Sequence, residues 1–349
     1  MMALFQRNKQ TIGLDIGSGF IKAAVVDHSG DEPRLSRIAS LPLVSDAIVE
    51  GEIMDPPLVV DTIQAVVQTL GTKARSVVTA VGGRDVIVKK IQMDRMPESD
   101  AREVIRWEAE QYVPFEMENV QLDFQILDPL AEGLQMEVLL VAAKRDLVDQ
   151  RMMLLADAGL QAAVVDVDAF ALFNAFEYNY PSASRGVGAL ANVGHEVTTV
   201  IVYEDGVPLV TRDVQFGSKQ VKEDLRRLHG LSSEEAEEIV QGQTKSSADA
   251  DKLLYERGAE LALAVERATA FLTMDGSGGT GIQAVNMSGG GARMPRLQDA
   301  ISDRLRVRIE VLNPFQRLEV GPDALADLPG EETASMWMLP VGLALRGPV

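Results

Sequence analysis

The sequence contains no cysteine, which excludes disulfide bonds and thiolate metal sites and is typical of a reducing compartment. Histidine is scarce, with three scattered residues that add little evidence for any site. Basic residues are also few relative to acidic ones: the sequence has 33 lysines and arginines and 52 aspartates and glutamates, which give a formal net charge of -19. A nucleic-acid footprint or a broad attraction to anionic lipid is therefore disfavoured, and a phosphate ligand would need a local site.

Long hydrophobic runs are missing as well. No stretch reaches the roughly 20 apolar residues that span a bilayer, and the apolar start at Met1–Phe5 is too short for a signal-peptide core. We therefore expect a cytoplasmic protein. The composition is otherwise that of a globular protein, with 46% hydrophobic and 24% charged residues, and 349 residues suffice for two domains with their own cores.

The stretch Thr11–Asp27 predicts a strand, a tight glycine turn and a second strand. Alternating apolar residues lead into Asp15-Ile16-Gly17-Ser18-Gly19, after which an apolar, β-branched run resumes. Glycine lets the backbone approach a ligand closely, and successive amide N–H groups in such a turn cradle an anion. Asp15 beside that cradle, with Lys22 nearby, suits Mg²⁺ held between carboxylate, water and phosphate oxygens.

A second copy of this pattern argues against an ordinary β-hairpin, the alternative that the first turn alone leaves open. The run Leu190-Ala191-Asn192-Val193-Gly194-His195 precedes a strand at Val197–Val202, so a strand, a polar-x-Gly turn and another strand recur. A further turn and a further strand follow in both places. Two similar halves that each offer a turn predict a ligand clamped between them.

A third glycine turn comes much later in the chain. Ala284–Met287 is predicted as a strand, Ser288-Gly289-Gly290-Gly291-Ala292 as a bare-backbone turn, and Pro295–Arg304 as a helix. Strand, glycine turn and helix N-terminus together let a nucleotide lie close to the main chain. Neither this turn nor the first continues into Gly-Lys-Ser/Thr or reads Gly-x-Gly-x-x-Gly at the start of a helix. A P-loop and a dinucleotide fold are therefore disfavoured.

The predicted fold class is α/β, with two related domains and an insertion. We expect a first domain at residues 1–87 and 166–185, and a second domain at 186–349 that includes a helical subdomain at about 219–281. Residues 88–165 read as strand, helix, strand, strand, helix and strand. This inserted module is not a repeat of either domain.

The three signals, acidic-x-Gly-Ser, polar-x-Gly and a late Ser-Gly-Gly-Gly-Ala, resemble those of the actin, Hsp70 and sugar-kinase superfamily, whose two related domains flank a nucleotide cleft. Within it, the chain resembles nearly from end to end the PilM family, the actin-like proteins of bacterial type IV pilus assembly. The related cell-division protein FtsA shares an inserted module but ends in an amphipathic membrane helix, which we do not expect here. The resemblance is carried by LDIGSGFIKAAVVD, IRWEAEQYVPFE, VDVDAFALFNAFE and GLALRG, at residues 14–27, 105–116, 165–177 and 342–347.

The resemblance implies an ATP site with Mg²⁺ between the two domains. It implies phosphate and metal contacts from the first turn, phosphate contacts from the second, adenosine contacts from the third, and base or ribose contacts from a later helix. The corresponding positions are Asp15 (to Mg²⁺ through water), Gly17, Ser18, Gly19 and Lys22; Asn192, Gly194 and His195; Gly289, Gly290 and Gly291; and Lys219, Lys222 and Glu223.

The second turn departs from the pattern of superfamily members that hydrolyse ATP, which commonly have an aspartate where this chain has Asn192. An amide hydrogen-bonds a metal-bound water but brings no negative charge to hold Mg²⁺ or polarise that water. Asp168 is the candidate for orienting an attacking water, with Asp166 as its substitute; the alternative is an acid that only stabilises a helix N-terminus. We expect nucleotide binding with hydrolysis slow or absent.

By resemblance, the expected function is a cytoplasmic scaffold at the inner membrane that binds the N-terminal tail of the membrane protein PilN and links it to other pilus assembly proteins and motor ATPases. The expected groove lies between the first domain and the inserted module, where an extended peptide adds along a strand edge. Two alternatives stay open, an active ATPase or sugar-kinase-like phosphotransferase and a polymerising bacterial actin. The groove residues expected are Val86–Met93 and the helix around Trp107, Glu110, Gln111 and Tyr112.

Overall fold

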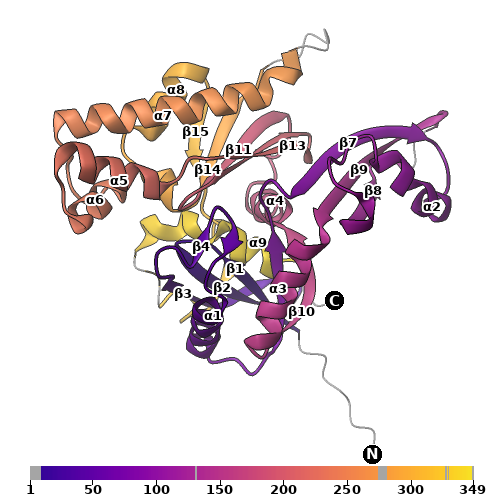
Figure 1. Ribbon diagram of the computed structural model, residues 1–349, viewed down its shortest axis with the longest axis horizontal. Coiled ribbons are helices and arrows are strands. Elements are labelled where there is room, and N and C mark those ends of the chain that lie inside the picture. The colour runs from indigo at the N-terminus through magenta and orange to yellow at the C-terminus, as the bar shows by residue number, and fades with distance from the viewer. Residues whose placement is uncertain (1–8, 130–131, 274–280, 327, 329, 348–349) are drawn as a thin grey trace, which may run out of the picture.

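The computed structural model describes residues 9–129, 132–273, 281–326, 328 and 330–347. The apolar start at Met1–Phe5 and residues 274–280 of the expected helical subdomain lie outside the described residues. The first domain lies below the second domain in Figure 1, and the inserted module lies to the right of both. No helix in the described ranges combines the length and apolarity that crossing a membrane requires.

The first domain is built on a six-stranded sheet in the order β10-β6-β1-β2-β3-β16. β1 and β2 form the predicted hairpin, and β2 continues antiparallel to β3. β6 runs parallel to β1, and β10 runs parallel to β6, so the carboxyl ends of β1, β6 and β10 meet at one edge of the sheet. The strands are β1 (Gln10–Ile16), β2 (Phe20–Asp27), β3 (Arg34–Pro42), β6 (Ser76–Val81), β10 (Gln161–Val167) and β16 (Glu319–Val320).

The second domain repeats this arrangement in the part β15-β14-β11-β12-β13 of an eight-stranded sheet. β11 and β12 are an antiparallel pair, β12 continues antiparallel to β13, and β14 and β15 add in parallel beside β11. The prediction of two similar halves is therefore confirmed in the strand topology. The strands are β11 (Val187–Val193), β12 (Thr198–Glu204), β13 (Val207–Val214), β14 (Ala284–Ser288) and β15 (Arg308–Val311).

The inserted module has the predicted order of elements but not the predicted end. Its sheet is β7-β9-β8, with antiparallel pairs throughout, and it joins the second domain through one pair of residues, Lys89 on β7 and Val210 on β13. The last predicted strand, β10, is instead hydrogen-bonded to β6 in the first-domain sheet. The elements are β7 (Val86–Asp94), α2 (Glu98–Ala109), η1 (Met117–Asn119), β8 (Val120–Ile126), β9 (Gln135–Lys144) and α3 (Arg145–Asp157).

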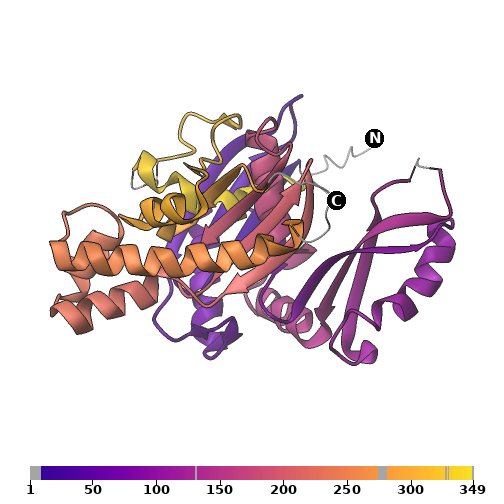
Figure 2. The ribbon, with the colours of Figure 1, turned by 90° about the horizontal axis from the view of Figure 1, so that it is seen from above.

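The two faces of the module sheet bury different neighbours. Residues alternate along a strand between the faces, and on β9 Val138 and Leu140 belong to the core that includes residues of α2, whereas Leu139 belongs to the core around α4 (Asp168–Asn179). The helix α2 therefore lies on the face turned away from α4. Figure 2 shows the module projecting from the two domains, with α2 on its outer side.

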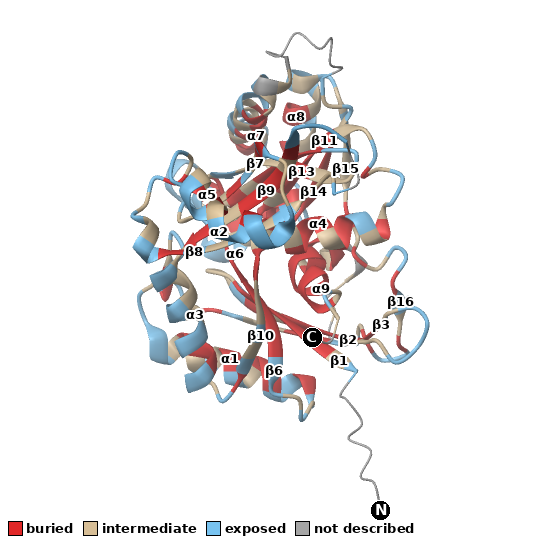
Figure 3. Ribbon diagram, turned by 90° about the vertical axis from the view of Figure 1, so that its right-hand side faces the viewer, coloured by how far each residue is buried: buried red, intermediate tan, exposed pale blue. Residues whose placement is uncertain are grey.

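Helices α1 (Pro56–Leu70) and α9 (Met338–Ala344) cover the first-domain sheet. Asp55 begins α1 by accepting a hydrogen bond from the backbone N–H of Leu58, and Gly71 ends it in the left-handed conformation. Gly13 on β1 allows α9 to approach, because a Cβ atom at this position would lie 2.1 Å from the carbonyl oxygen of Pro340. Buried residues concentrate in the strands, α4 and α9, whereas α1, α2 and α3 carry exposed faces (Figure 3).

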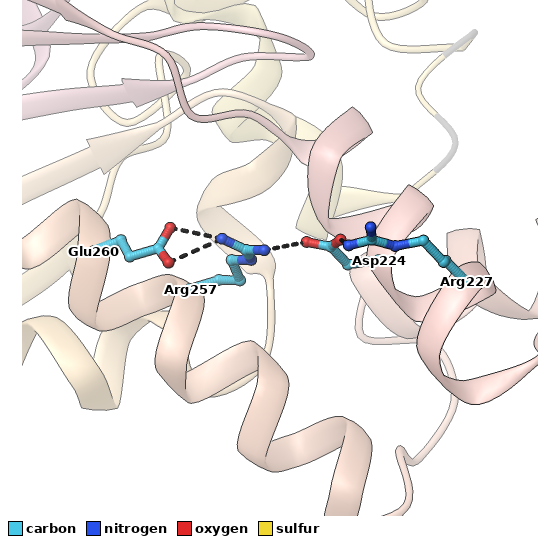
Figure 4. A network of polar contacts seen from close by, with 4 residues as sticks. All are labelled: Asp224, Arg227, Arg257 and Glu260. Atoms are coloured by element: carbon cyan, nitrogen blue, oxygen red, sulfur yellow. Dashed lines mark hydrogen bonds and ion pairs between the residues drawn. The ribbon is translucent and has the colours of Figure 1, made fainter.

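A helical layer extends from the second domain. Figure 4 shows the polar network that joins α5 to α7: the buried Asp224 carboxylate forms ion pairs with Arg227 and Arg257, and Arg257 also binds Glu260. This network holds α5 against α7. The helices of this layer are α5 (Ser218–His229), α6 (Ser233–Val240), α7 (Ala248–Thr269) and α8 (Leu297–Leu305).

Candidate functional site

The first and second glycine turns face each other across the two domains. A Cβ atom added to Gly19 would lie 2.8 Å from Cγ of the His195 ring, so the two turns are in direct contact. They also close in the same way, because the N–H of Gly17 donates to the carbonyl oxygen of Phe20 and that of Gly194 donates to Val197. The structure thus brings together the two turns that the sequence pattern related.

A buried ion pair lies at the base of the first turn. Asp15 and Lys22 are partners in the β1–β2 register, and Oδ2 of Asp15 lies 2.6 Å from Nζ of Lys22. Their side chains are only 9% and 15% exposed. Nζ of Lys22 also donates to the carbonyl oxygen of Met336, 3.3 Å away in η4 (Glu331–Trp337), so the lysine ties the turn to the C-terminal part of the chain.

The third glycine turn packs directly behind the second. Gly289 has a left-handed φ of 85°, and a Cβ atom there would lie 2.3 Å from the carbonyl oxygen of Val193. The hydroxyl of Ser288 donates to Oδ1 of Asn192 at 3.0 Å, which joins the two turns through side chains. Gly291 also contacts Val193, whereas the Cα of Gly290 has only the Met336 side chain near it. The second and third turns therefore form one glycine-rich surface.

Helix α5 supplies contacts across the two domains and within the second. Nζ of Lys219 lies 2.9 Å from Glu196 and 3.0 Å from Asp46 of the first domain, and hydrogen bonds to these carboxylates raise the pKa of Lys219 to about 12. Lys222 pairs instead with Glu237 on α6 at 2.6 Å. Glu223 is exposed. The role of these residues around a base or ribose stays a prediction.

Asp168 lies where the strand ends of the first domain meet, as the first residue of α4. Burial and the carboxylate of Asp15 raise the pKa of Asp168 to about 7, against the opposing effect of Arg151. Gly82 makes room for it, because a Cβ atom on this glycine would lie 2.3 Å from Oδ2 of Asp168. Asp166, the predicted substitute, is engaged elsewhere: both of its carboxylate oxygens accept hydrogen bonds from Arg346, at 2.7 and 2.8 Å.

Two residues of this region carried no signal in the sequence. Gly82 follows β6 as part of a Gly-Gly pair that marks only the end of a strand, and Arg151 lies in the middle of α3 with no motif around it. Burial lowers the pKa of Arg151, while the carboxylates of Asp168 and Asp15 raise it. Its position next to both carboxylates follows from how α3 packs, so no local pattern could have revealed it.

A hollow of about 260 Å³ opens beside Asp168 where the first domain, the second domain and the module meet. Val86 and Ile87 of the expected peptide groove line it. The helix around Trp107 does not, because α2 lies on the opposite face of the module sheet, and the expected groove residues are therefore divided between two faces. Residues of the hollow are Gly82, Gly83, Arg84, Val86, Ile87, Val167, Asp168, Ala169, Thr199, Thr211, Arg212 and Asp213.

The residues between the domains fit a phosphate chain better than a metal held by protein alone. Glycine turns from both halves present bare backbone, and a single buried carboxylate, Asp15, lies beside the first turn. Among the described residues, no group of three or more Asp, Glu, His or Cys side chains is placed to hold a metal. A divalent cation here would need phosphate oxygens and water as most of its ligands, which is the usual manner of Mg²⁺.

Comparison with known proteins points to one family. The family model described as type IV pilus assembly protein PilM matches residues 13–348. Among solved structures, the chain is similar to one from the PilM–PilN type IV pilus biogenesis complex. The two share 28% sequence identity and a TM-score of 0.82, over 96% of this chain and 98% of that chain.

More distant structures share the fold. Ethanolamine utilization protein EutJ from Carboxydothermus hydrogenoformans has 16% identity and a TM-score of 0.59, over 96% of this chain and 89% of that chain. MreB 5 of Spiroplasma citri bound to AMPPNP has 12% identity and a TM-score of 0.51, over 96% of this chain and 94% of that chain. At these identities the likeness concerns the fold alone, and it confirms the predicted actin-like α/β architecture.

Proposed function

Because the chain belongs to the PilM family of type IV pilus assembly proteins, we propose that it is an actin-like scaffold that holds ATP and Mg²⁺ between its two domains and binds the N-terminal tail of an inner-membrane PilN protein. Through PilN it is placed at the cytoplasmic face of the inner membrane, where other pilus assembly proteins and motor ATPases are its further partners. PilN is named in the complex to which the chain is similar, and the nucleotide is suggested by the glycine turns.

The observation that carries the nucleotide proposal is the contact between the first and second turns at Gly19 and His195. Backbone N–H groups from both domains then surround the phosphates, and Asp15 orients water on Mg²⁺. The third turn, at Gly289–Gly291, receives the adenosine. A ligand that contacts both domains binds the closed arrangement more tightly than an open one. Its binding therefore favours the closed arrangement.

Calorimetric titration of the purified protein with ATP and Mg²⁺ tests this proposal directly. We expect saturable binding to the wild type and a loss of at least roughly tenfold in affinity in Asp15→Ala, because a water-bridged carboxylate is removed from the metal. Asp61→Ala on α1, an exposed acid far from the turns in the sequence, serves as the matched control. Absence of binding to the wild type would refute the nucleotide proposal.

Hydrolysis is proposed to be slow or absent. Asn192 brings no charge to the second turn, and its Oδ1 is already an acceptor for Ser288. One observation favours an active ATPase as the second candidate: a carboxyl with a pKa of about 7, such as Asp168, is poised to take a proton from water near neutral pH. Steady phosphate release by the wild type, lost in Asp168→Ala with ATP binding retained, would favour the ATPase.

The tail proposal concerns the junction of the first domain and the module. β7 pairs with β9 along its length and contacts β13 at Lys89, so it offers little free edge. β8 and β10 are outer strands of their sheets in the described part of the chain. Helix α3 contacts both strands, and Arg346, bound to Asp166 of β10, is also within electrostatic reach of Asp123 on β8. The two outer strands thus approach each other.

We place the tail along the outer edge of β10, with apolar side chains of the peptide against the junction. Partly buried apolar residues from both sides are available there and belong to one cluster. An extended peptide gains backbone hydrogen bonds from a free strand edge and specificity from alternate side chains. The residues of the junction that we expect it to contact are Leu127, Val141, Val164 and Phe170.

Tail binding is tested with a synthetic peptide of the PilN tail and fluorescence anisotropy. Leu127→Asp is expected to weaken binding at least roughly tenfold, because it puts a charge into a desolvated apolar contact. Leu134→Asp is the matched control, since Leu134 is in the same module but 90% exposed. Equal peptide affinities of the two variants would show that the tail does not bind at this junction.

Saturating ATP is expected to change the affinity for the peptide. An unchanged affinity would show that nucleotide binding and tail binding are not coupled.

A further inference from the structure

Helix α3 is shared between the module and the first domain. It begins at Arg145, directly after the last residue of β9, Lys144, with no loop between strand and helix. Its later residues Leu154 and Leu155 belong to the first-domain core. Any displacement of α3 at the first domain is therefore transmitted directly to the strand that forms the centre of the module sheet.

Arg151 lies on the face of α3 that packs against the first domain. Residues three and four positions apart share a helix face, so Arg151 shares its face with Leu154 and Leu155. The helix contacts β6 and β10, and Gly82 and Asp168 are the residues that directly follow these two strands. The guanidinium interacts electrostatically with Asp168 and with Asp15, the acid at the base of the first turn.

One donor atom of this arginine has no partner among the described residues. Its Nη1 atom is buried and has no hydrogen-bond partner. Asp15 already pairs with Lys22, and Asp168 interacts with the guanidinium through charge, so neither carboxylate accepts a hydrogen bond from Nη1. Buried donors are normally satisfied, so an unsatisfied one beside a ligand cleft indicates an acceptor that the ligand supplies.

We propose that Arg151 binds the terminal phosphate of the nucleoside triphosphate and thereby transmits the presence of that phosphate through α3 to the module. The proposal rests on the nucleotide site proposed above and adds a residue and a route of regulation to it. A guanidinium presents several donors in a planar fork that matches phosphate oxygens. A diphosphate does not reach this donor, and the module then senses the difference between ATP and ADP.

The experiment compares ATP and ADP, each with Mg²⁺, in calorimetric titrations of the wild type, Arg151→Met and Arg151→Lys. Arg151→Met is expected to weaken ATP at least roughly tenfold and ADP by less than about twofold, since only ATP carries the phosphate that Arg151 contacts. Arg151→Lys is expected to restore part of the ATP affinity because it keeps the charge but not the fork. Arg145→Met, an exposed arginine at the start of the same helix, is the matched control.

The outcomes separate this proposal from the nucleotide site itself. A wild type that binds neither nucleotide overturns both. A wild type that binds ATP, with ATP and ADP affinities lowered equally or not at all in Arg151→Met, overturns only the role of Arg151. Amide hydrogen exchange in the wild type gives a second measurement that does not depend on how the variants fold. ATP is expected to protect residues 145–157 more than ADP does, and equal protection overturns the proposal.

Discussion

The first and second domains share one strand pattern but present different chemistry to each other. In both, an antiparallel pair closes on a glycine turn and a parallel strand adds beside the first strand of the pair. The first turn has a buried ion pair, Asp15 and Lys22, at its base. The second has Asn192 and, beside it, His195. Burial and the nearby Lys222 lower the pKa of His195. The first turn therefore has an ion pair at its base, whereas the ion pair beside the second turn is formed by Glu196 and Lys219, which follow it in the chain.

This difference indicates a division of roles. Strand topology is set by apolar residues along each strand, which both domains keep, whereas the chemistry depends on a few side chains at the turns. For the proposed nucleotide site, we therefore expect the first domain to position the metal and the phosphates and the second to contribute backbone and shape. Four predictions test this division, beginning with the one of largest expected effect.

Backbone shape is most demanding in the second domain. Gly289→Ala is expected to lower the free energy of unfolding by roughly 2–4 kcal/mol, because φ is 85° and the new Cβ would lie 2.3 Å from the Val193 carbonyl oxygen. Gly17→Ala in the first turn is expected to cost about 1 kcal/mol, since its nearest contact is 3.1 Å and its φ is not left-handed. Urea denaturation without nucleotide measures both.

The control for Gly289→Ala is Gly290→Ala, whose Cβ would meet only the flexible Met336 side chain at 3.7 Å or more. We expect this neighbour to be close to wild type in unfolding free energy. If both alanine variants were equally destabilised, the positive φ and the close contact of Gly289 would not explain the loss, and the second domain would have no special demand on its backbone.

The first and second turns also differ in the charge of the side chains at Asp15 and Asn192. This difference is tested by exchanging the acid and the amide. Asp15→Asn leaves the buried Lys22 without its partner and is expected to weaken Mg²⁺-ATP roughly 30-fold. Asn192→Asp places a carboxylate at the second turn, where the Ser288 hydroxyl still has an acceptor, and is expected to raise phosphate release at least several-fold. Calorimetry and a phosphate-release assay follow the two effects. Unchanged phosphate release in Asn192→Asp would show that the amide is not what limits hydrolysis.

Asp168 predicts a pH dependence confined to the first domain. Its pKa is raised to about 7 in the folded state, so folding favours the neutral carboxyl. Its stabilising effect is therefore complete below the unfolded-state pKa near 4 and is lost as the pH rises through about 7. Asp168→Asn removes this dependence and is expected to be more stable than the wild type by roughly 1–3 kcal/mol at pH 8, with the difference vanishing toward pH 4. Thermal unfolding across this range measures it.

The neighbouring charges must be considered with this prediction. Asp15, Asp166 and Asp213 raise the pKa of Asp168, and Arg151 lowers it. A difference that stayed constant from pH 4 to pH 8 would assign the effect of the asparagine to packing or hydrogen bonding rather than to titration. The matched variant Asp166→Asn is expected to be destabilised instead, because it breaks the double hydrogen bond to Arg346.

The turns were predictable from sequence because their signals are local. Glycine between alternating apolar runs marks a strand–turn–strand unit wherever it occurs, and the order of the three turns was enough to predict an actin-like fold. Gly19, Asn192 and Gly289 lie where the pattern placed them, at turns that contact one another. The confirmed part is the architecture; the ligand roles of these residues stay predictions.

What could not be predicted depends on tertiary packing. β10 reads like any short apolar strand, and only pairing partners decide that it belongs to the first-domain sheet rather than to the module. Trp107 is on an amphipathic helix whose spacing identifies a buried face but not which side of a sheet covers it. Arg151 is one of many charged residues on helices, and its buried Nη1 emerges only when α3 is packed against the strand ends.

The smallest expected effect comes from the contact that spans the domains. Lys219 pairs with Glu196 of its own domain and with Asp46 of the first, and the Asp46 side chain is 72% exposed. Exposed ion pairs contribute little and are screened by salt, so Lys219→Ala is expected to weaken ATP binding only about two- to fivefold at low ionic strength, with the difference lost near 1 M salt. Lys252→Ala, whose partner Glu256 lies on the same helix of the second domain, is the matched control. A salt-independent loss in Lys219→Ala would mean that the lysine contacts the nucleotide itself, and the second domain would then contribute charge as well as shape.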